Sequence, residues 1–486
     1  MRAPGPFATR GPPRAKAALR REPAQGLPVS GSPATEFDVI VIGAGPAGEV
    51  LAGELARRGR SVAIVEERLV GGECAFFACM PSKALLRPAE VLAEARRVPG
   101  AAEALTGELD VAAVLRRRDE VTGGRDDARE LPWLAEHGIS LIRGRGRLAG
   151  ERTVTVDGVP HRARDAVVIA TGSAPSLPDV PGLAAARPWT NREATTAEAI
   201  PASLLVLGGG VVGVEMAQAY RELGADVAIV EPLERLLARE EEFASQEIAA
   251  ALRALGIELR LGAHATAVAR EGTGIRVELA DGSRLEAEEI LVAAGRRPLS
   301  EDIGLETVGL RGGETIEVDD QLRAGGREWL YALGDVNGRS LQTHVGKYQA
   351  RVAADVIAGG DARVRHDRSG APRVVFSDPQ LAAVGLTLAG ALERGLDARA
   401  YDSPSSATAG ASFHGRETAG TSRVVLDVDR RVLVGATFVG VEVAEWLHAA
   451  TIAVVAEVPL ELLRHAIPAF PTRSEVWLRL LEQIEI

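Results

Sequence analysis

Cysteine, lysine and long apolar runs are scarce in this 486-residue chain. Two cysteines are too few for a disulfide framework, which fits a reducing compartment, and we expect a cytoplasmic protein. No apolar run reaches the length of a transmembrane helix, so we expect no membrane association. The net charge of −11 argues against nucleic acid as a partner. The remaining composition is that of a globular protein, and the length predicts more than one domain.

The three lysines of the chain, Lys16, Lys83 and Lys347, stand against 53 arginines. Where only positive charge is needed, this chain uses arginine, so a lysine indicates a site that requires a compact ammonium group. Lys83 follows both cysteines, Cys74 and Cys79, in one short stretch. This grouping suggests a redox couple with an ammonium beside it. The alternative is a pair of small buried hydrophobic residues, the usual environment of free cysteine.

The spacing of the two cysteines constrains the local backbone. On a regular helix, residues i and i+5 do not share a face, and their Cα atoms lie too far apart for a relaxed disulfide. A bond between Cys74 and Cys79 therefore requires a distorted first turn, after which Pro81 can help to restart the helix. Strain raises the reduction potential of a disulfide, which is typical of a catalytic bond. With only two thiols and no histidine nearby in sequence, we expect no metal site.

A dinucleotide-binding fingerprint begins with a buried strand at 37–42. A glycine turn follows, then a helix expected at 49–58 and a second strand at 61–65 that ends at an acid. Glycines in such a turn let the backbone approach a pyrophosphate at the helix N-terminus, and the acid binds ribose hydroxyls. The glycines and the acid are Gly43, Gly45, Gly48 and Glu66. Because all parts stand in the required order, we predict a dinucleotide site here.

The same unit recurs with a strand at 203–207, a helix expected at 214–223 and a strand at 226–230. Its glycines and acid are Gly208, Gly210, Gly213 and Glu231. Two units indicate two dinucleotides, and a flavin with a nicotinamide nucleotide is the natural pair for moving two electrons. Glu231 would repel a 2′-phosphate and accept from a free 2′-hydroxyl, which favours NADH over NADPH. Arg235 is near enough in sequence to weaken that preference.

Two fingerprints with a Cys-x-x-x-x-Cys loop after the first resemble the pyridine nucleotide-disulfide oxidoreductases. That family includes dihydrolipoamide dehydrogenase, glutathione reductase and mercuric reductase. Four further stretches are similar to its landmarks, in the same order. Residues 167–172 resemble the strand that leaves the first domain, and 294–298 resemble the return crossing. Residues 331–335 resemble the second flavin motif, and 374–385 the start of the dimerisation domain. The resemblance covers residues 36–486.

The resemblance implies an α/β fold with two Rossmann-like domains, for FAD and for NAD, and a C-terminal α+β dimerisation domain. The FAD-binding domain is expected at 36–175 and 296–371, with the NAD(P)-binding domain inserted at 176–295. Residues 372–486 are expected to be an antiparallel sheet with helices that forms a twofold homodimer. Residues 1–35, rich in Pro, Ala, Gly and Arg, are predicted to be a disordered leader rather than a transit peptide.

The resemblance also implies a mechanism. NADH reduces FAD on one face, and a Cys74–Cys79 disulfide receives the electrons on the other. Cys79 is then the thiol nearest the flavin, and Cys74 meets the acceptor. Lys83 is expected to pair with Glu215 beside flavin N5, whereas the alternative for Glu215 is an exposed helix charge. The predicted catalytic residues are Cys74, Cys79, Lys83, Glu215 and Glu475. The predicted cofactor-binding residues are Gly43, Gly45, Gly48, Glu66, Gly72, Lys83, Thr171, Gly172, Gly208, Gly210, Gly213, Glu231, Gly295, Arg296, Gly334 and Asp335.

The C-terminus departs from the family. Disulfide-reducing members carry His-Pro-Thr-x-x-Glu, whose histidine serves as acid and base for the interchange thiol across the dimer interface. Here Phe470 replaces that histidine, although Pro471, Thr472 and Glu475 match. Phenylalanine cannot transfer a proton, a service that typically contributes about 10²–10⁴-fold to the rate. His465 could substitute, but nothing in the sequence places it at the thiol.

The residues between the cysteines include Phe76 and Phe77, which either pack into the core or line an apolar acceptor site. The second reading, with no histidine, favours a flat acceptor such as a quinone, reduced by NADH. Two alternatives are a dihydrolipoamide dehydrogenase of a 2-oxo acid dehydrogenase complex and a thiol oxidase or redox sensor. Mercuric reductase is set aside because the chain lacks the additional cysteines that would transfer the metal.

Overall fold

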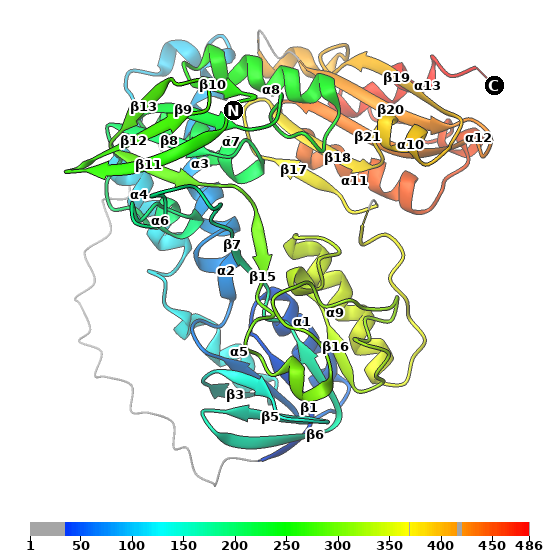
Figure 1. Cartoon of the computed structure of the whole chain (residues 1–486). Coiled ribbons are helices and arrows are strands. Elements are labelled where there is room, and N and C mark those ends of the chain that lie inside the picture. Colours follow the sequence, from blue (N-terminus) through cyan, green and yellow to red (C-terminus); the bar gives the residue numbers. More distant parts are fainter. Residues whose placement is uncertain (1–34, 369, 416–419, 486) are drawn as a thin grey trace, which may run out of the picture. The chain divides into compact units, whose positions relative to one another are not determined.

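The computed structural model describes residues 35–368, 370–415 and 420–485 (Figure 1). All but the last residue of the predicted leader at 1–35 therefore lies outside the described residues. The described residues form three parts, each built on a β-sheet, and a short two-stranded ribbon connects two of them. The fold class predicted from the sequence is confirmed. The domain boundaries at 175, 295 and 371 stay predictions.

The first fingerprint forms the centre of a seven-stranded sheet. β1 pairs in parallel with β2 on one side and with β6 on the other. Val39, Ile40 and Val41 of β1 are fully buried, as expected for a parallel strand covered on both faces. The strands are β1 (Glu36–Ile42), β2 (Val62–Glu66), β3 (Ser140–Arg143), β4 (Gly146–Leu148), β5 (Thr153–Val156), β6 (Val159–Ile169) and β16 (Leu330–Ala332).

Helices α1 and α9 of this first part pack against each other (Figure 1). Its other helices include α3, the long helix that begins at the second cysteine. The helices are α1 (Pro46–Arg57), α2 (Gly72–Phe76), α3 (Cys79–Arg97), α4 (Val111–Val121), α5 (Leu131–Glu136) and α9 (Thr343–Ile357). The 3₁₀ helices are η1 (Ala102–Ala104), η2 (Asp127–Arg129), η3 (Leu305–Val308) and η4 (Gly334–Asn337).

The second fingerprint forms a four-stranded parallel sheet, next to which a three-stranded antiparallel sheet is formed from the following residues. The parallel strands are β8 (Ser203–Leu207), β9 (Asp226–Glu231), β10 (Glu258–Leu261) and β14 (Glu289–Val292). The antiparallel strands are β11 (Ala265–Glu271), β12 (Gly274–Leu279) and β13 (Arg284–Ala287). The helices are α6 (Asn191–Thr196), α7 (Val211–Glu222) and α8 (Glu242–Ala254).

Both helices that follow a glycine turn begin three residues earlier than predicted. The sequence placed their starts at Glu49 and Val214, whereas α1 begins at Pro46 and α7 at Val211. The reason is that the backbone N–H groups of Glu49 and Val214 already donate to the carbonyls four residues earlier, at Gly45 and Gly210. The last residues of each turn are therefore the first turn of the helix.

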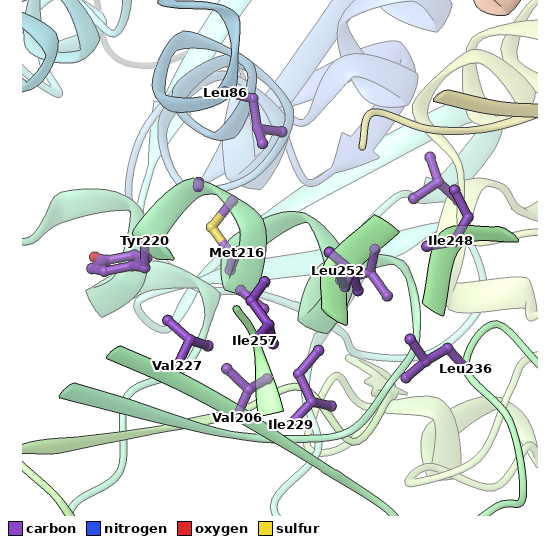
Figure 2. Close-up of a cluster of buried hydrophobic side chains, with 14 of the residues drawn as sticks. Leu86, Val206, Met216, Tyr220, Val227, Ile229, Leu236, Ile248, Leu252 and Ile257 are labelled. Atoms are coloured by element: carbon purple, nitrogen blue, oxygen red, sulfur yellow. The ribbon is translucent and has the colours of Figure 1, made fainter. Parts of the chain in front are cut away.

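One hydrophobic cluster links the first and second parts of the chain. Figure 2 shows Leu86 of α3 above Met216 and Tyr220 of α7, with Leu252 of α8 to the right of Met216 and Val206 of β8 below it. All five side chains are buried. Because α3 begins at the second cysteine, this shared core positions the cysteine stretch against the second fingerprint.

The C-terminal part is a five-stranded antiparallel sheet with helices, as predicted. The apolar runs at 423–428 and 432–437 predict a hairpin around 429–431, and the pairing of β20 with β21 confirms it. The strands are β17 (Arg373–Val375), β18 (Gln380–Gly385), β19 (Ala398–Pro404), β20 (Thr421–Asp427) and β21 (Val432–Gly440). The helices are α10 (Leu388–Glu393), α11 (Val443–Val455), α12 (Leu460–Leu463) and α13 (Val476–Leu481), with 3₁₀ helices η5 (Gly410–His414) and η6 (Arg473–Glu475).

The chain leaves and re-enters the first part along a two-stranded antiparallel ribbon. β7 (Ser173–Pro175) carries the outgoing chain and β15 (Arg296–Pro298) the returning chain, with Arg296 opposite Pro175. The two crossings predicted from the sequence are therefore side by side. Among the helices that the structure describes, none combines the length and apolar character needed to cross a bilayer.

Candidate active site

The two cysteines lie on either side of a break between two helices. α2 ends at Phe76 and α3 begins at Cys79, and Ala78 between them has the non-helical angles φ −134° and ψ −97°. This is the distorted turn that the cysteine spacing predicted. Cys74 and Cys79 are half-buried free thiols, and they are close enough to form a hydrogen bond to each other.

Side chains of α6 hold this break in place. The carbonyl of Phe77 accepts hydrogen bonds from Asn191 Nδ2 at 2.7 Å and from Thr195 Oγ1 at 3.1 Å. Arg192 forms a two-pronged ion pair with Glu73, at 2.6 and 3.1 Å. The sequence analysis missed this clamp, because nothing in the sequence relates α6 to the cysteine stretch.

The environment gives the two thiols opposite acidities. The hydrogen bond from Cys74, the Thr343 hydroxyl at 3.5 Å and the charge of Lys83 outweigh burial and lower the pKa of Cys79 to about 6. The same hydrogen bond, followed by burial and the charge of Cys79, raises the pKa of Cys74. In the reduced pair, Cys79 is therefore the thiolate at neutral pH and Cys74 is the protonated thiol. Thr343, at the start of α9, is a second contact that the sequence analysis did not identify.

Lys83 and Glu215 form an ion pair, at 2.7 Å between Nζ and Oε2. The Glu215 side chain is only 4% exposed, so it is not the exposed helix charge that was the alternative. Its second oxygen accepts from the backbone N–H of Phe376 at 3.0 Å, and Lys83 Nζ lies 4.8 Å from the centre of the Phe376 ring. The predicted pairing is confirmed, whereas its position beside flavin N5 stays a prediction.

The first glycine turn combines tight packing with one open position. A Cβ atom at Gly43 would collide with the carbonyl of Ala170, and one at Gly48 with the carbonyl of Gly43. Gly45 has no atom within 4 Å of its would-be Cβ, and Gly72, at the start of α2, packs its backbone against Gly45. The space in front of Gly45, at the N-terminus of α1, fits a dinucleotide pyrophosphate.

The second glycine turn repeats this arrangement. A Cβ atom at Gly208 would collide with the carbonyl of Ala293, and one at Gly213 with the carbonyl of Gly208. Gly210 again has no atom within 4 Å of its would-be Cβ. The residues of both turns therefore fit dinucleotides by the same criterion, an opening at the helix N-terminus that any side chain would fill.

The acid that closes each unit is bonded in the same way in both. Each carboxylate accepts from the N–H of the second residue of its glycine turn, and from the N–H two residues after the acid itself. For Glu66 these donors are Ala44 at 2.9 Å and Arg68 at 2.7 Å. For Glu231 they are Gly209 at 2.5 Å and Leu233 at 2.9 Å. Each acid therefore lies beside the opening of its turn.

A polar chain joins the ribbon to the second flavin-like motif. Arg296 Nε donates to Ser173 Oγ at 2.7 Å, and Ser173 Oγ donates to Asp335 Oδ2 at 2.5 Å. Burial raises the pKa of Asp335, although the Ser173 hydrogen bond and the Arg296 charge oppose that shift. The neighbour Gly334 packs against Ala47 of α1, so this motif lies beside the first glycine turn.

Three further predicted residues lie at the two ends of the ribbon. Thr171 Oγ1 donates to the carbonyl of Leu299 at 2.6 Å, and the carbonyl of Gly172 accepts from the Leu299 N–H at 2.9 Å. The carbonyl of Gly295 accepts from the N–H of Ser176. These contacts hold the crossings in register, and the cofactor contacts of the three residues stay predictions.

Glu49 and Lys347 are the charged residues that matter near the first glycine turn. Burial, helped by Glu130 and Glu66, raises the pKa of Glu49 to about 7 in the first turn of α1. The charge of Lys347 opposes this rise, and it also opposes the rise in the pKa of Cys74. Both lysines in the described part of the chain therefore act on the cysteine stretch or the adjacent turn.

The C-terminal segment carries no histidine at the family's acid–base position. Phe470 is 77% exposed and His465 is also exposed. Glu475 accepts from the N–H of Thr472 at 3.3 Å and caps η6. Within the described ranges, no histidine hydrogen-bonds to Cys74 or Cys79. The catalytic role of Glu475 stays a prediction, and its observed contact is a helix cap.

The two aromatic residues between the cysteines have different environments. Phe76 is 4% exposed and packs against Gly71, so the hypothesis that it lines an acceptor site is wrong. Its ring fills the space beneath the turn. Phe77 is half-buried, with the Arg192 guanidinium 4.8 Å from its ring centre.

Comparison with known proteins identifies relatives along almost the whole chain. The family model described as pyridine nucleotide-disulphide oxidoreductase matches residues 37–350, and that of its dimerisation domain matches 371–480. The dihydrolipoyl dehydrogenase of Mycobacterium tuberculosis (strain ATCC 25618 / H37Rv) is 35% identical over 91% of this chain and 96% of that protein. The mercuric reductase of Staphylococcus aureus is 30% identical over 90% and 81%. Among solved structures, the HOCl-induced flavoprotein disulfide reductase RclA from Escherichia coli has a TM-score of 0.81 at 26% identity, covering 92% of this chain and 100% of that chain.

The contrast between two glycines of the second turn is testable. Gly213→Ala places a methyl group on the carbonyl of Gly208, so we expect a loss of about 1–3 kcal/mol of stability and a lower Tm. Gly210→Ala meets no atom, so we expect an unchanged Tm, but its methyl group fills the opening and should raise the Kd for NADH at least about tenfold. Thermal melting and NADH titration measure the two effects. Wild-type NADH affinity in Gly210→Ala would contradict the assignment of the opening.

The acidity of Cys79 predicts a pH profile for alkylation of the reduced protein. The thiolate is lost as pH falls through its pKa, so alkylation of Cys79 should be half-maximal near pH 6. Thr343→Val removes a hydrogen bond to the thiolate and should raise that midpoint by about one unit. Thr343→Ser keeps the hydroxyl and is the matched control. Mass spectrometry of the alkylated peptide distinguishes Cys79 from Cys74, and an unshifted midpoint in Thr343→Val would refute the role of the hydroxyl.

Proposed function

Because the chain belongs to the pyridine nucleotide-disulphide oxidoreductase family, we propose that it catalyses the NADH-dependent reduction of a small electron acceptor. In this proposal a bound FAD supplies two-electron chemistry between NADH and the Cys74–Cys79 couple. NADH gives up a hydride, and one further proton comes from solvent. The products are NAD⁺ and an acceptor reduced by two electrons and two protons.

The openings at Gly45 and Gly210 indicate which residues would hold the two cofactors. For the flavin nucleotide they are Gly43, Gly45, Gly48, Glu66, Gly72, Lys83, Thr171, Gly172, Arg296, Gly334 and Asp335. For the nicotinamide nucleotide they are Gly208, Gly210, Gly213, Glu231 and Gly295. The open positions at Gly45 and Gly210 support both assignments, since each is the point where a pyrophosphate would meet a helix N-terminus.

The acceptor class rests on one observation, the lack of a histidine at the family's acid–base position in the C-terminal segment. Cys74 has a raised pKa, so without an acid–base partner it is a poor nucleophile for exchange with another disulfide. Phe470 stands where disulfide-reducing relatives carry histidine, and it is exposed and apolar. These features favour an acceptor that needs no thiol exchange with an outside disulfide, such as a quinone.

NADH is proposed as the preferred donor. Glu231 presents a carboxylate beside the second glycine turn, which disfavours a 2′-phosphate. Arg235, the residue that could have attracted such a phosphate, donates instead to the backbone carbonyls of Ala238 at 2.7 Å and Glu240 at 2.9 Å. The Arg235 guanidinium is therefore already hydrogen-bonded within its own loop.

A dihydrolipoyl dehydrogenase activity is the second candidate, because the Mycobacterium tuberculosis relative of that name is 35% identical to this chain. Phe470 argues against it, and co-purification with a 2-oxo acid dehydrogenase complex would support it. A thiol oxidase or redox sensor is the third, and it would show slow NADH turnover with fast dithiol-dependent oxygen uptake. We also propose a homodimer through the matched dimerisation domain, and a cytoplasmic location.

Steady-state kinetics with an acceptor panel test the proposal. We expect a quinone to turn over faster than lipoamide or glutathione disulfide. Cys74→Ser should lower that turnover more than about tenfold, since the couple is lost. Phe470→His should raise lipoamide turnover, because an acid–base group typically contributes about 10²–10⁴-fold to the rate. Lipoamide or glutathione disulfide exceeding every quinone in the wild type would refute the acceptor class, and full quinone activity in Cys74→Ser would show that electrons bypass the thiols.

Donor preference is measured separately. We expect kcat/KM for NADH to exceed that for NADPH by more than about tenfold, because a 2′-phosphate would face Glu231. Glu231→Gln removes the repelling charge and should lower the ratio of kcat/KM for NADH to kcat/KM for NADPH. Arg235→Met is the control and should leave the ratio unchanged, because that side chain is bound to backbone carbonyls. A wild-type preference for NADPH would overturn the assignment.

A further inference from the structure

A cavity of about 410 Å³ lies in the C-terminal part, away from the glycine turns and the cysteines. It is bounded by η5, the start of α11 and η6. Its lining includes His414, Glu442, Trp446, Thr472 and Arg473. We propose that this cavity binds an oxyanion, a carboxylate or phosphate group, through the guanidinium of Arg473.

The Arg473 side chain lacks the partners that a buried charge requires. The residue is only 7% exposed, yet none of its three guanidinium nitrogens has a hydrogen-bond partner in the described residues. Buried charges in folded proteins are normally paired, because desolvation of an unpaired charge is strongly unfavourable. Arginine cannot relieve this by losing its proton. A bound anion supplies the missing acceptors.

A second buried donor lines the same cavity. Trp446 is buried, and its indole Nε1–H also lacks an acceptor in the described part of the chain. The Arg473 guanidinium lies 5.4 Å from the centre of the Trp446 ring, and a Cβ atom at Gly440 would be 3.2 Å from Arg473 Nη2. The ring and the Gly440 backbone therefore hold the guanidinium in place, and its planar fork matches carboxylate and phosphate oxygens.

The acidic residues nearby do not satisfy Arg473. Glu442 and Glu445 line the cavity, but neither hydrogen-bonds to the guanidinium. Ligand atoms of Glu94, His414 and Glu442 lie within 4.8 Å of one another, a grouping that could also hold a cation. A cation would leave the donors of Arg473 and Trp446 without acceptors and add positive charge beside them. The unpaired donors therefore favour an anion over a metal ion.

Binding to the dimeric holoenzyme tests the site, with inorganic phosphate and succinate as probes in separate calorimetric titrations. Arg473→Met should weaken saturable binding of the preferred anion at least about tenfold. Arg473→Lys keeps the charge but loses the fork, and it should be intermediate. Arg479→Met is the control, because Arg479 is exposed on α13 and pairs with Glu482, and its affinity should equal that of the wild type.

The oxyanion has two sources, a free small molecule or a carboxylate side chain of a second copy of this chain. Sedimentation distinguishes them. If the second copy is the source, the wild-type dimer should bind neither probe. The dimer dissociation constant of Arg473→Met should then be at least about tenfold higher than that of the wild type. Equal anion affinity in wild type and Arg473→Met, or no anion binding together with an unchanged dimer dissociation constant, would overturn the proposal. Neither readout depends on the electron acceptor.

Discussion

The ion pair between Lys83 and Glu215 ties together three parts of the chain that are distant in sequence. Lys83 belongs to α3, directly after the cysteines, and Glu215 belongs to α7, directly after the second glycine turn. The remaining oxygen of Glu215 is bonded to the backbone of Phe376 at the start of the C-terminal sheet. A buried carboxylate without these two partners would be strongly destabilising. The position of the cysteines relative to the second turn depends on this contact, and the shared core of α3 and α7 supports it.

The two glycine turns show how one physical solution is used twice. In each, two glycines allow backbone to pack on backbone, and the glycine between them leaves an opening at the helix N-terminus. In each, the closing acid is held by two backbone N–H groups, so its position is fixed by the turn it serves. The two turns differ in the residues that lie next to them. The first turn meets the start of α2 at Gly72 and therefore the cysteine stretch, whereas the second has Leu236, in the loop after β9, beside it.

The asymmetry of the two thiols arises from neighbours that come from different elements. Thr343 begins α9, Lys83 lies within α3, and the clamp on Phe77 comes from α6. The hydrogen bond from Cys74, with Thr343 and Lys83, lowers the pKa of Cys79, whereas the hydrogen bond to Cys79 and burial raise the pKa of Cys74. The clamp holds the backbone between the two thiols. In the C-terminal segment, Phe470 is exposed and Glu475 caps η6. Phe470, where disulfide-reducing members of the family carry histidine, is the departure on which the proposed acceptor class rests.

Local sequence determined the strand–turn–helix units, the break at the cysteines and the C-terminal hairpin. These depend on periodicity, on glycine geometry and on the reach of a disulfide, all of which act over a few residues. The helix starts were missed by three residues, because a turn and a first helical turn share the same backbone. The tertiary structure alone decided the burial of Phe76, the clamp by Asn191 and Arg192, and the contact of Thr343 with Cys79. It also decided that Arg473 is buried without a partner. Contacts of this kind join residues far apart in the chain, and no local pattern encodes which side chain a buried group will meet.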